Sequence, residues 1–416
     1  MSIRARFLLL LGLRWLPVGL MVPVSVLLPL ERGLTLAQAG SVVAIQGVVV
    51  LILELPTGGL TDALGRRPVL VAAGVLSLAS ATLLACAHSI AAFAVYWLLQ
   101  GIYRALDSGP LEAWFVDHAL AADPAADIET GLSRSGVVIG VAVSGGALLG
   151  GGVVALGPWG PVSALTGPVL VSIVLQAVSL TCVLVLMTEE RAVRGVAALA
   201  ASVRGVPGAI LGAVRIVRGS RVVAALVAVE LFWSFGMPAF ETLTPVRLSA
   251  LLGSSDRASA LMGPAGSAAW GASALGAALI PLLVRRIGAR WTGFTLRLAQ
   301  GVTVAGMGLL GGVAGVIGAY LLTYTVHGAA NPVHAGLLHR QVDGPHRASL
   351  ISLNSMVGQP GLSLGMIALT AVAGSAGVGA AMVIGAAALA IAAPLYLVKA
   401  RASQPMWSLR ATTTGV

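Results

Sequence analysis

Charged residues are scarce in this chain of 416 residues. They make up 10% of the sequence, whereas soluble globular domains carry about 25%, and hydrophobic residues make up 57%. This shortage excludes an ordinary soluble protein. Apolar runs of about 20 residues or more recur along the chain, and each can cross the hydrocarbon core of a bilayer. The composition therefore predicts an all-α polytopic membrane protein.

Cysteines are few, and recognisable catalytic motifs are missing. Cys86 and Cys182 are the two cysteines, and both lie in apolar runs where a free cysteine packs as a small hydrophobic residue. The sequence has no G-x-x-x-x-G-K-[ST] loop, so it gives no support for ATP-driven transport. It also has no Ser/His/Asp set with catalytic spacing. We therefore expect no enzyme and no cofactor, and a proton gradient as the energy source.

Apolar segments between polar or Gly/Pro breaks predict twelve membrane-spanning helices in two bundles of six. The basic segment between the bundles predicts one or two amphipathic helices on the membrane surface. The predicted regions are an N-terminal bundle at 1–187, a cytoplasmic linker at 188–221, a C-terminal bundle at 222–398 and a cytoplasmic tail at 399–416. The predicted spans are 7–30, 37–60, 68–88, 91–117, 131–156, 162–187, 222–248, 258–284, 291–313, 316–338, 348–373 and 376–398.

Arginines are unevenly shared between the two sides of the predicted membrane protein. With the N-terminus in the cytoplasm, most of them lie on the cytoplasmic side, including Arg66 and Arg67. The other side then carries little more than Arg32 and Arg257. This follows the positive-inside rule, so the net charge of +10 indicates topology and not nucleic-acid binding. We expect a multi-pass protein of the inner membrane with both termini in the cytoplasm.

The two bundles show traces of an internal repeat. The turn Leu64–Arg67 has a counterpart at Ile287–Arg290, and Gln100-Gly101 corresponds to His327-Gly328. Two related halves favour a substrate site between them, near the bilayer midplane.

The segment GGLTDALGRR at Gly58–Arg67 resembles motif A of the major facilitator superfamily, G-x-L-x-D-x-x-G-R-R/K, and lies between spans two and three as in that family. Glu54–Gly58 resembles a preceding motif of bacterial efflux pumps. The segment Gly146–Gly151 resembles the antiporter signature of span five, with Ala where proline is usual. The resemblance implies a monomeric secondary transporter, embedded in the lipid bilayer, that exports drugs or natural products.

The same resemblance implies a gate on the cytoplasmic side. It places Asp62 beside the start of span eleven and pairs Arg66 with an acid at the foot of span four, for which Asp117 is the matching residue. The alternative is that these charges only orient the chain. The implied gate residues are Gly58, Asp62, Gly65, Arg66, Arg67 and Asp117.

Acidic residues inside the spans are candidates for proton coupling, because a charge at the bilayer centre costs roughly 2.5–3.5 kcal/mol. Asp107 lies three residues after Arg104, so the two form either a local ion pair or part of a site. Glu230 and Glu241 lie about three turns apart on nearly the same helix face. Asp107 and Glu241 are our first choices. The candidates are Glu54, Asp107, Glu112, Glu230 and Glu241.

Cations, histidines and aromatic residues inside the spans are candidates for lining a cavity. His327 and His334 are seven apart and share a face, which would suit proton relay. A metal site is not expected, because no cysteine or carboxylate lies near them in sequence. The candidates are Arg14, Arg104, Trp233, Arg297, His327 and His334.

Together these features predict a proton-coupled antiporter that exports an amphiphilic small organic molecule by alternating access. The alternatives are an importer or facilitator of a small solute, and a non-transporting receptor or scaffold.

Overall fold

The computed structural model of the chain is a helical protein. It describes residues 1–124, 126–188, 204, 208, 211, 214, 215, 217–341 and 344–399. The side chains at 55, 56, 58, 59, 62, 344–349 and 351 lie outside this description. Most of the predicted linker at 188–221 and almost all of the predicted tail at 399–416 therefore also lie outside the described residues.

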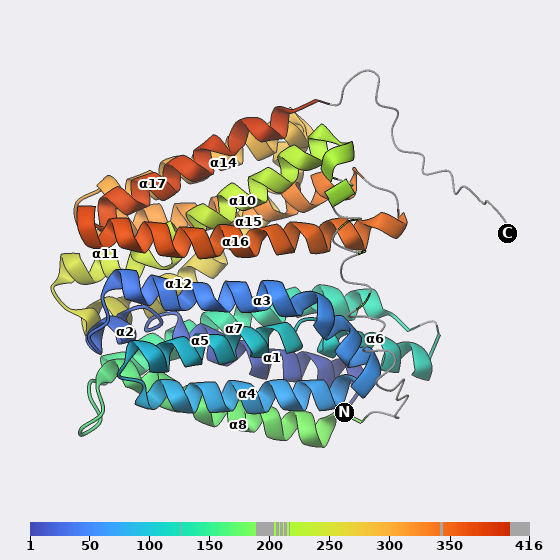
Figure 1. Ribbon diagram of the computed structural model, residues 1–416, viewed down its shortest axis with the longest axis horizontal. Helices are drawn as coiled ribbons and strands as arrows, with labels where there is room; N and C mark the ends of the chain where they lie inside the picture. Colours follow the sequence, from blue (N-terminus) through green and yellow to red (C-terminus); the bar gives the residue numbers. More distant parts are fainter. Residues whose placement is uncertain are drawn as a thin grey trace.

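The helices form two groups that lie one above the other (Figure 1). The first group contains α1 (Ile3–Met21), α2 (Leu27–Glu31), α3 (Leu36–Leu64), α4 (Arg66–Cys86), α5 (Ile90–Leu106), α6 (Pro110–Ala122), α7 (Ile128–Ala155), η1 (Ala164–Thr166) and α8 (Gly167–Leu186). The second contains α10 (Arg221–Glu241), α11 (Leu243–Leu252), α12 (Ser255–Ala278), α13 (Ile280–Ile287), α14 (Ala289–Leu309), α15 (Val313–His339), α16 (Gly344–Ala376), α17 (Val378–Ile391) and η2 (Ala393–Leu397).

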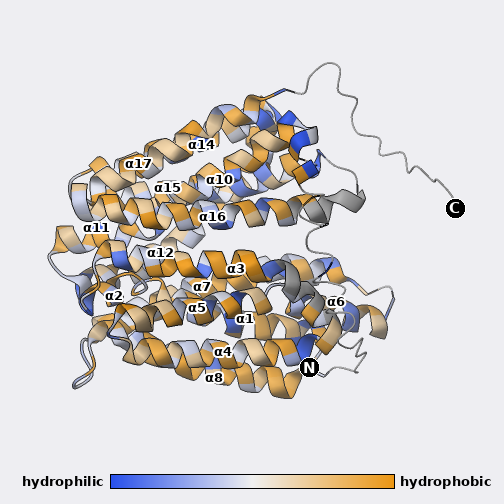
Figure 2. Cartoon of the chain, in the orientation of Figure 1, coloured by the Kyte–Doolittle hydropathy of each residue, from blue (hydrophilic) through white to orange (hydrophobic). Residues whose placement is uncertain are grey.

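These elements confirm the predicted fold class. Within the described residues, nine segments are long and apolar enough to cross a membrane. Each predicted span coincides with one helix or with two consecutive ones. Apolar residues cover the helices along most of their length (Figure 2). We call the end of the molecule with the N-terminus and the Gly65 turn the terminal face, and the other end the opposite face (Figure 1).

Short sequence signals set the helix ends. Thr35 begins α3 with a capping box, in which its hydroxyl accepts from the Gln38 backbone N–H and the Gln38 side chain accepts from the Thr35 backbone N–H. Gly65 joins α3 to α4 with φ 90° and ψ 162°, a conformation that glycine adopts without strain. Gly288 joins α13 to α14 with φ 78° and ψ 154°. The corresponding turn in the other half therefore has nearly the same backbone shape.

The fourth predicted span is broken, which differs from the single helix expected at 91–117. The helix α5 ends at Leu106, Asp107 forms its C-cap, and α6 begins at Pro110. Gly109 between them has φ 93° and ψ −23°. Proline cannot supply a backbone N–H and favours the first turn of a helix, so Gly109-Pro110 ends one helix and starts another. The break places Asp107 at a helix terminus inside the bundle.

Arg32 holds the first bundle together at the opposite face. Its guanidinium donates to the carbonyl oxygens of Leu84, Ala85 and Ala87 and to the Thr166 hydroxyl, over 2.5–3.1 Å. These acceptors come from the end of α4 and from η1. Burial lowers the pKa of Arg32, an effect that the neighbouring Glu31 carboxylate opposes.

Among the described residues, the bundles meet mainly through two helix pairs: α3 packs on α16, and α7 packs on α12. A Cβ atom built on Gly151 of α7 would lie 2.6 Å from Gly263 Cα of α12, so the two backbones touch with no room for a side chain. Ser259 of α12 donates a hydrogen bond of 2.9 Å to the Pro23 carbonyl. These contacts lie towards the opposite face, where the bundles are therefore tightly closed.

Candidate substrate-binding cavity

A cavity of about 560 Å³ lies within the first bundle and reaches α16 of the second. This volume is within the range of small-molecule sites. Its wall combines apolar and aromatic side chains with amides and hydroxyls. The charged residues that line it are Arg14, Glu54, Arg104 and Asp107. The aromatic residues are Trp15, Tyr96, Trp97 and Tyr103, and the amides are Gln46, Gln100, Gln176 and Gln359.

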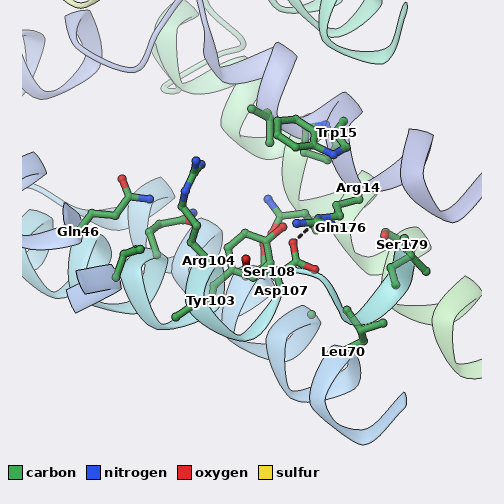
Figure 3. A pocket seen from close by; sticks show the side chains of 18 of the residues that line it. Arg14, Trp15, Gln46, Leu70, Tyr103, Arg104, Asp107, Ser108, Gln176 and Ser179 are labelled. Atoms are coloured by element: carbon green, nitrogen blue, oxygen red, sulfur yellow. Dashed lines mark hydrogen bonds and ion pairs between the residues drawn. The ribbon is translucent and has the colours of Figure 1, made fainter. Parts of the chain in front are cut away.

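Asp107 and Arg14 form an ion pair in the cavity wall (Figure 3). Asp107 is 4% exposed, and Tyr103 interacts electrostatically with it. The break between α5 and α6 positions Asp107, and α1 supplies Arg14. Because the buried Asp107 carboxylate has a cationic partner, the pair avoids the high cost of an isolated buried charge.

Arg104 lies one turn before Asp107 but does not pair with it. Its side chain extends away from the Arg14–Asp107 pair (Figure 3). The spacing allowed a local ion pair between Arg104 and Asp107, and this prediction is wrong. The partner of Asp107 is Arg14, which lies on another helix. Among the described residues, Arg104 makes no hydrogen bond and no ion pair within 4.0 Å. It is an exposed cation in the wall of the cavity.

Glu54 lines the same cavity from α3 and contacts the other bundle. Its Oε1 accepts a hydrogen bond of 3.3 Å from the Ser355 hydroxyl of α16. Its Oε2 is buried and has no hydrogen-bond partner among the described residues. Glu54 is therefore a carboxylate at the boundary between the bundles with one oxygen still available.

The second bundle contains a buried polar cluster that the cavity does not reach. Glu230 lies 3.7 Å from His334 Nε2, which is also 3.3 Å from Asn354 Oδ1, and His334 Nδ1 lies 3.1 Å from the Tyr396 hydroxyl. Arg297 is 1% exposed and interacts electrostatically with Glu230. Five helical segments contribute to this cluster, so it fixes their relative positions.

Arg297 also belongs to an aromatic group beside this cluster. Its guanidinium donates to Gln300 over 2.6 Å and lies 5.6 Å from the centre of the Trp233 ring. Trp233 in turn stacks on His327 with ring centres 5.6 Å apart. His327 and His334 thus have different neighbours, although their spacing predicted a shared face. A proton relay between them has no contact to support it in the described residues.

Glu241 is the last residue of α10 and lies apart from Glu230. Its carboxylate accepts from the Tyr324 hydroxyl over 3.5 Å and interacts electrostatically with Arg104 of the first bundle. Arg14 and Arg297, the cavity candidates that could neutralise Glu241 from within the spans, have other partners. Arg14 instead pairs with Asp107, and Arg297 serves Glu230.

The proposed gate residues surround the Gly65 turn. Arg66 forms an ion pair with Asp117 and donates to the Ala113 carbonyl over 2.6 Å, and Arg67 donates to the Leu184 carbonyl over 2.7 Å. Gly58 and Asp62 fall within α3, but the Asp62 side chain lies outside the described part of the chain. Glu112 is exposed in the first turn of α6 and does not line the cavity.

Sequence reasoning missed the neutral polar residues of the cavity and of the buried cluster. Gln46, Gln176 and Gln359 line the cavity, Ser355 bonds to Glu54, and Asn354 bonds to His334. Their signal was available, because amides inside apolar spans are costly without partners. Among the described residues, no three His, Cys, Asp or Glu side chains gather as a metal site would require.

Two stacked helical bundles that enclose a mixed polar and apolar cavity define a polytopic membrane transporter for small molecules. The chain belongs to the Major Facilitator Superfamily, whose family model matches residues 7–328. Membership of this family indicates a transporter and implies no cofactor. A comparison with curated proteins finds no significant match.

Solved structures of transporters have the same fold. The nucleoside transporter NupG superposes with a TM-score of 0.75 at 13% identity, covering 95% of this chain and 98% of that one. A bacterial homologue of the human lysosomal transporter Spinster gives 0.70 at 14% identity, covering 95% of each chain. A bacterial homologue of the iron transporter ferroportin gives 0.69 at 16% identity, covering 95% and 99%. At these identities the likeness establishes the fold alone.

Proposed function

We propose that the chain is a proton-coupled antiporter that exports an amphiphilic organic molecule from the cytoplasm. The observation that carries the proposal is Glu54, a carboxylate that lines the cavity and bonds to Ser355 of the other bundle. A proton on Glu54 changes both the charge of the cavity and a contact between the bundles. Proton binding is thereby linked to the movement that exposes the cavity to one side or the other.

The arrangement of charges supports this choice among the five candidate acids. Asp107 is already neutralised by Arg14, and Glu230 lies in the buried cluster away from the cavity. Glu112 is exposed outside the cavity. Glu241 is the second candidate because it interacts electrostatically with Arg104, which lines the cavity.

We propose that the protein lies in the inner membrane and that its terminal face is on the cytoplasmic side. The arginines at the α3–α4 and α13–α14 junctions, Arg66, Arg67, Arg285 and Arg286, lie at helix ends on this face, in agreement with the positive-inside rule. The bundles touch closely near the opposite face. We therefore interpret the structure as the inward-facing arrangement, with the Arg66–Asp117 pair at the cytoplasmic gate.

Transport into inside-out membrane vesicles tests the proposal. Vesicles from cells that express the chain should accumulate candidate amphiphilic compounds only when a proton gradient is present. Glu54→Gln should abolish the response to the gradient at equal protein level, because glutamine keeps the shape and loses the titratable group. Arg257→Gln, at an exposed position in the first turn of α12, is the control for expression and folding. Uptake that ignores both the gradient and Glu54→Gln would refute the proposal, and increased accumulation in intact cells would favour an importer.

A further inference from the structure

Four charged residues line the cavity, and among the described residues two of them form no contact ion pair. Arg14 and Asp107 neutralise each other. Arg104 and Glu54 make no ion pair within 4.0 Å among the described residues. Among the described residues, the cavity therefore presents one positive and one negative charge without a contact ion pair. Glu241 of the second bundle interacts electrostatically with Arg104 but does not line the cavity.

These two charges lie at similar depth on neighbouring helices. Gly101 of α5 opposes α3 so closely that a Cβ atom there would lie 2.7 Å from Val49 and 3.2 Å from the Gln46 carbonyl. Both helices run from the opposite face to the terminal face (Figure 1). Arg104 lies three residues beyond Gly101 on α5, and Glu54 lies five residues beyond Val49 on α3. At a rise of 1.5 Å per residue, the two residues differ by about one helical turn or less in their position along the helix axes.

The remaining wall suits an aromatic or apolar body with hydrogen-bond acceptors. Trp15 and Trp97 line the cavity, and the buried indole N–H of each has no partner among the described residues. A bound molecule can offer acceptors to these donors and a hydrogen-bond donor to the free Glu54 Oε2. Buried polar groups are normally paired, so these atoms indicate where a ligand or water completes the site.

We propose that the substrate is an amphiphilic zwitterion, with its carboxylate on Arg104, its ammonium group on Glu54 and its apolar body against the aromatic wall. This inference rests on the proposed function only in assuming that the cavity binds substrate. It gives antiport a simple basis, because a proton and the ammonium group compete for the same carboxylate. Neither a purely cationic nor a purely anionic molecule would satisfy both charges.

Equilibrium binding to the purified full-length protein tests this substrate class. The probes are phenylalanine and 4-(aminomethyl)phenylacetic acid, each as the zwitterion, as the cationic methyl ester and as the anionic N-acetyl derivative. Intrinsic tryptophan fluorescence reports binding. A hydrogen bond to a charged group contributes roughly 1.5–3 kcal/mol, so a zwitterion should bind about 10- to 100-fold more tightly than either derivative.

Two variants assign the two charges. In Arg104→Gln the zwitterion should bind no better than its methyl ester, and in Glu54→Gln no better than its N-acetyl derivative. Arg257 and Asp256 are exposed residues in the first turn of α12. They provide the matched controls Arg257→Gln and Asp256→Asn, which should leave the preference unchanged.

The inference is overturned if all three forms of each probe bind alike, or if no form binds. It is also overturned if the cationic ester or the anionic N-acetyl derivative binds and the zwitterion does not, or if the preference survives both cavity variants. These outcomes differ from failure of the proposed function. A zwitterion preference without gradient-driven uptake would refute proton-coupled export alone, whereas gradient-driven uptake without the preference would refute the zwitterion alone.

Discussion

Substitution of Gly151 by alanine should open the contact between α7 and α12. The added Cβ would lie 2.6 Å from Gly263 Cα and 2.8 Å from the Ala260 carbonyl oxygen. Both neighbours belong to helix backbone and cannot rotate away. Overpacking of this kind costs about 1–3 kcal/mol. Because α7 and α12 belong to different bundles, that cost falls on the arrangement in which the opposite face is closed.

We expect the substitution to lower the population of the arrangement with a closed opposite face, in favour of the arrangement with an open one, and not simply to unfold the protein. A penalty of 1–3 kcal/mol on one of two states changes their ratio by about 5- to 150-fold. Spin labels report this ratio when placed at Leu156 and Leu310, exposed positions of the two bundles near the opposite face. Cys86 and Cys182 are first replaced by serine. Double electron–electron resonance should then show a larger fraction of long distances in Gly151→Ala.

Gly152→Ala is the matched control on the same helix. A Cβ at Gly152 meets no atom within 4 Å, so this variant gains the helix propensity of alanine without the clash. The reasoning is refuted if Gly151→Ala and Gly152→Ala give the same distance distribution. It is also refuted if Gly151→Ala shortens the distances.

Three further predictions concern single residues of the first bundle. Arg32→Lys should lower the free energy of unfolding by about 2 kcal/mol or more, because an ammonium group cannot donate to all four acceptors, and thermal unfolding in detergent measures the loss. Gly109→Ala should cost about 1–2 kcal/mol through its φ of 93° alone, since no atom lies within 4 Å of the new Cβ; equal stability to Gly136→Ala, which is also uncrowded, would contradict this. Hydrogen bonds from the Thr130 side chain and backbone lower the pKa of Asp127 in the folded protein. The Asp127 carboxylate therefore stabilises the fold fully above its unfolded pKa of about 3.9, and this stabilisation is lost as the pH falls through the lower folded pKa. The difference in melting temperature between wild type and Asp127→Ala should therefore be constant from pH 7 to pH 5 and shrink below about pH 4; a difference that grows on acidification would contradict the assignment.

Much of the fold could be predicted from the sequence, because lipid imposes strong requirements. Every span needs a long apolar run, and the alternating distribution of arginines gives the runs a direction. The segment Gly58–Arg67 identified the superfamily, and the structure brings Arg66 and Asp117 together as the resemblance implied. The gate role of that pair stays a prediction, as do the roles of the five acids.

The contacts between distant residues could not be predicted, because they depend on how the helices pack. The sequence places Asp107 beside Arg104, yet the break at Gly109 turns Asp107 towards Arg14. Arg104 is thereby left without a contact ion pair in the part of the chain that the structure describes. Likewise, nothing near Glu54 in sequence indicates Ser355, which lies 301 residues away and reaches it only through the packing of α3 on α16. The charged residues of the cavity could therefore be identified from the sequence, but the partner of each could not.

The four bonds of Arg32 have a consequence for how the molecule can move. All four acceptors lie in the same bundle as Arg32, so none of these bonds has to break when the bundles separate. The rim formed by the end of α4, the α2–α3 loop and η1 should therefore turn as one rigid body. Amide hydrogen exchange in this rim should stay equally slow in Gly151→Ala and in wild type, while amides along α7 and α12 become faster to exchange. When the bundles rotate relative to one another, the movement then takes place at the α3–α16 and α7–α12 contacts and does not bend either bundle.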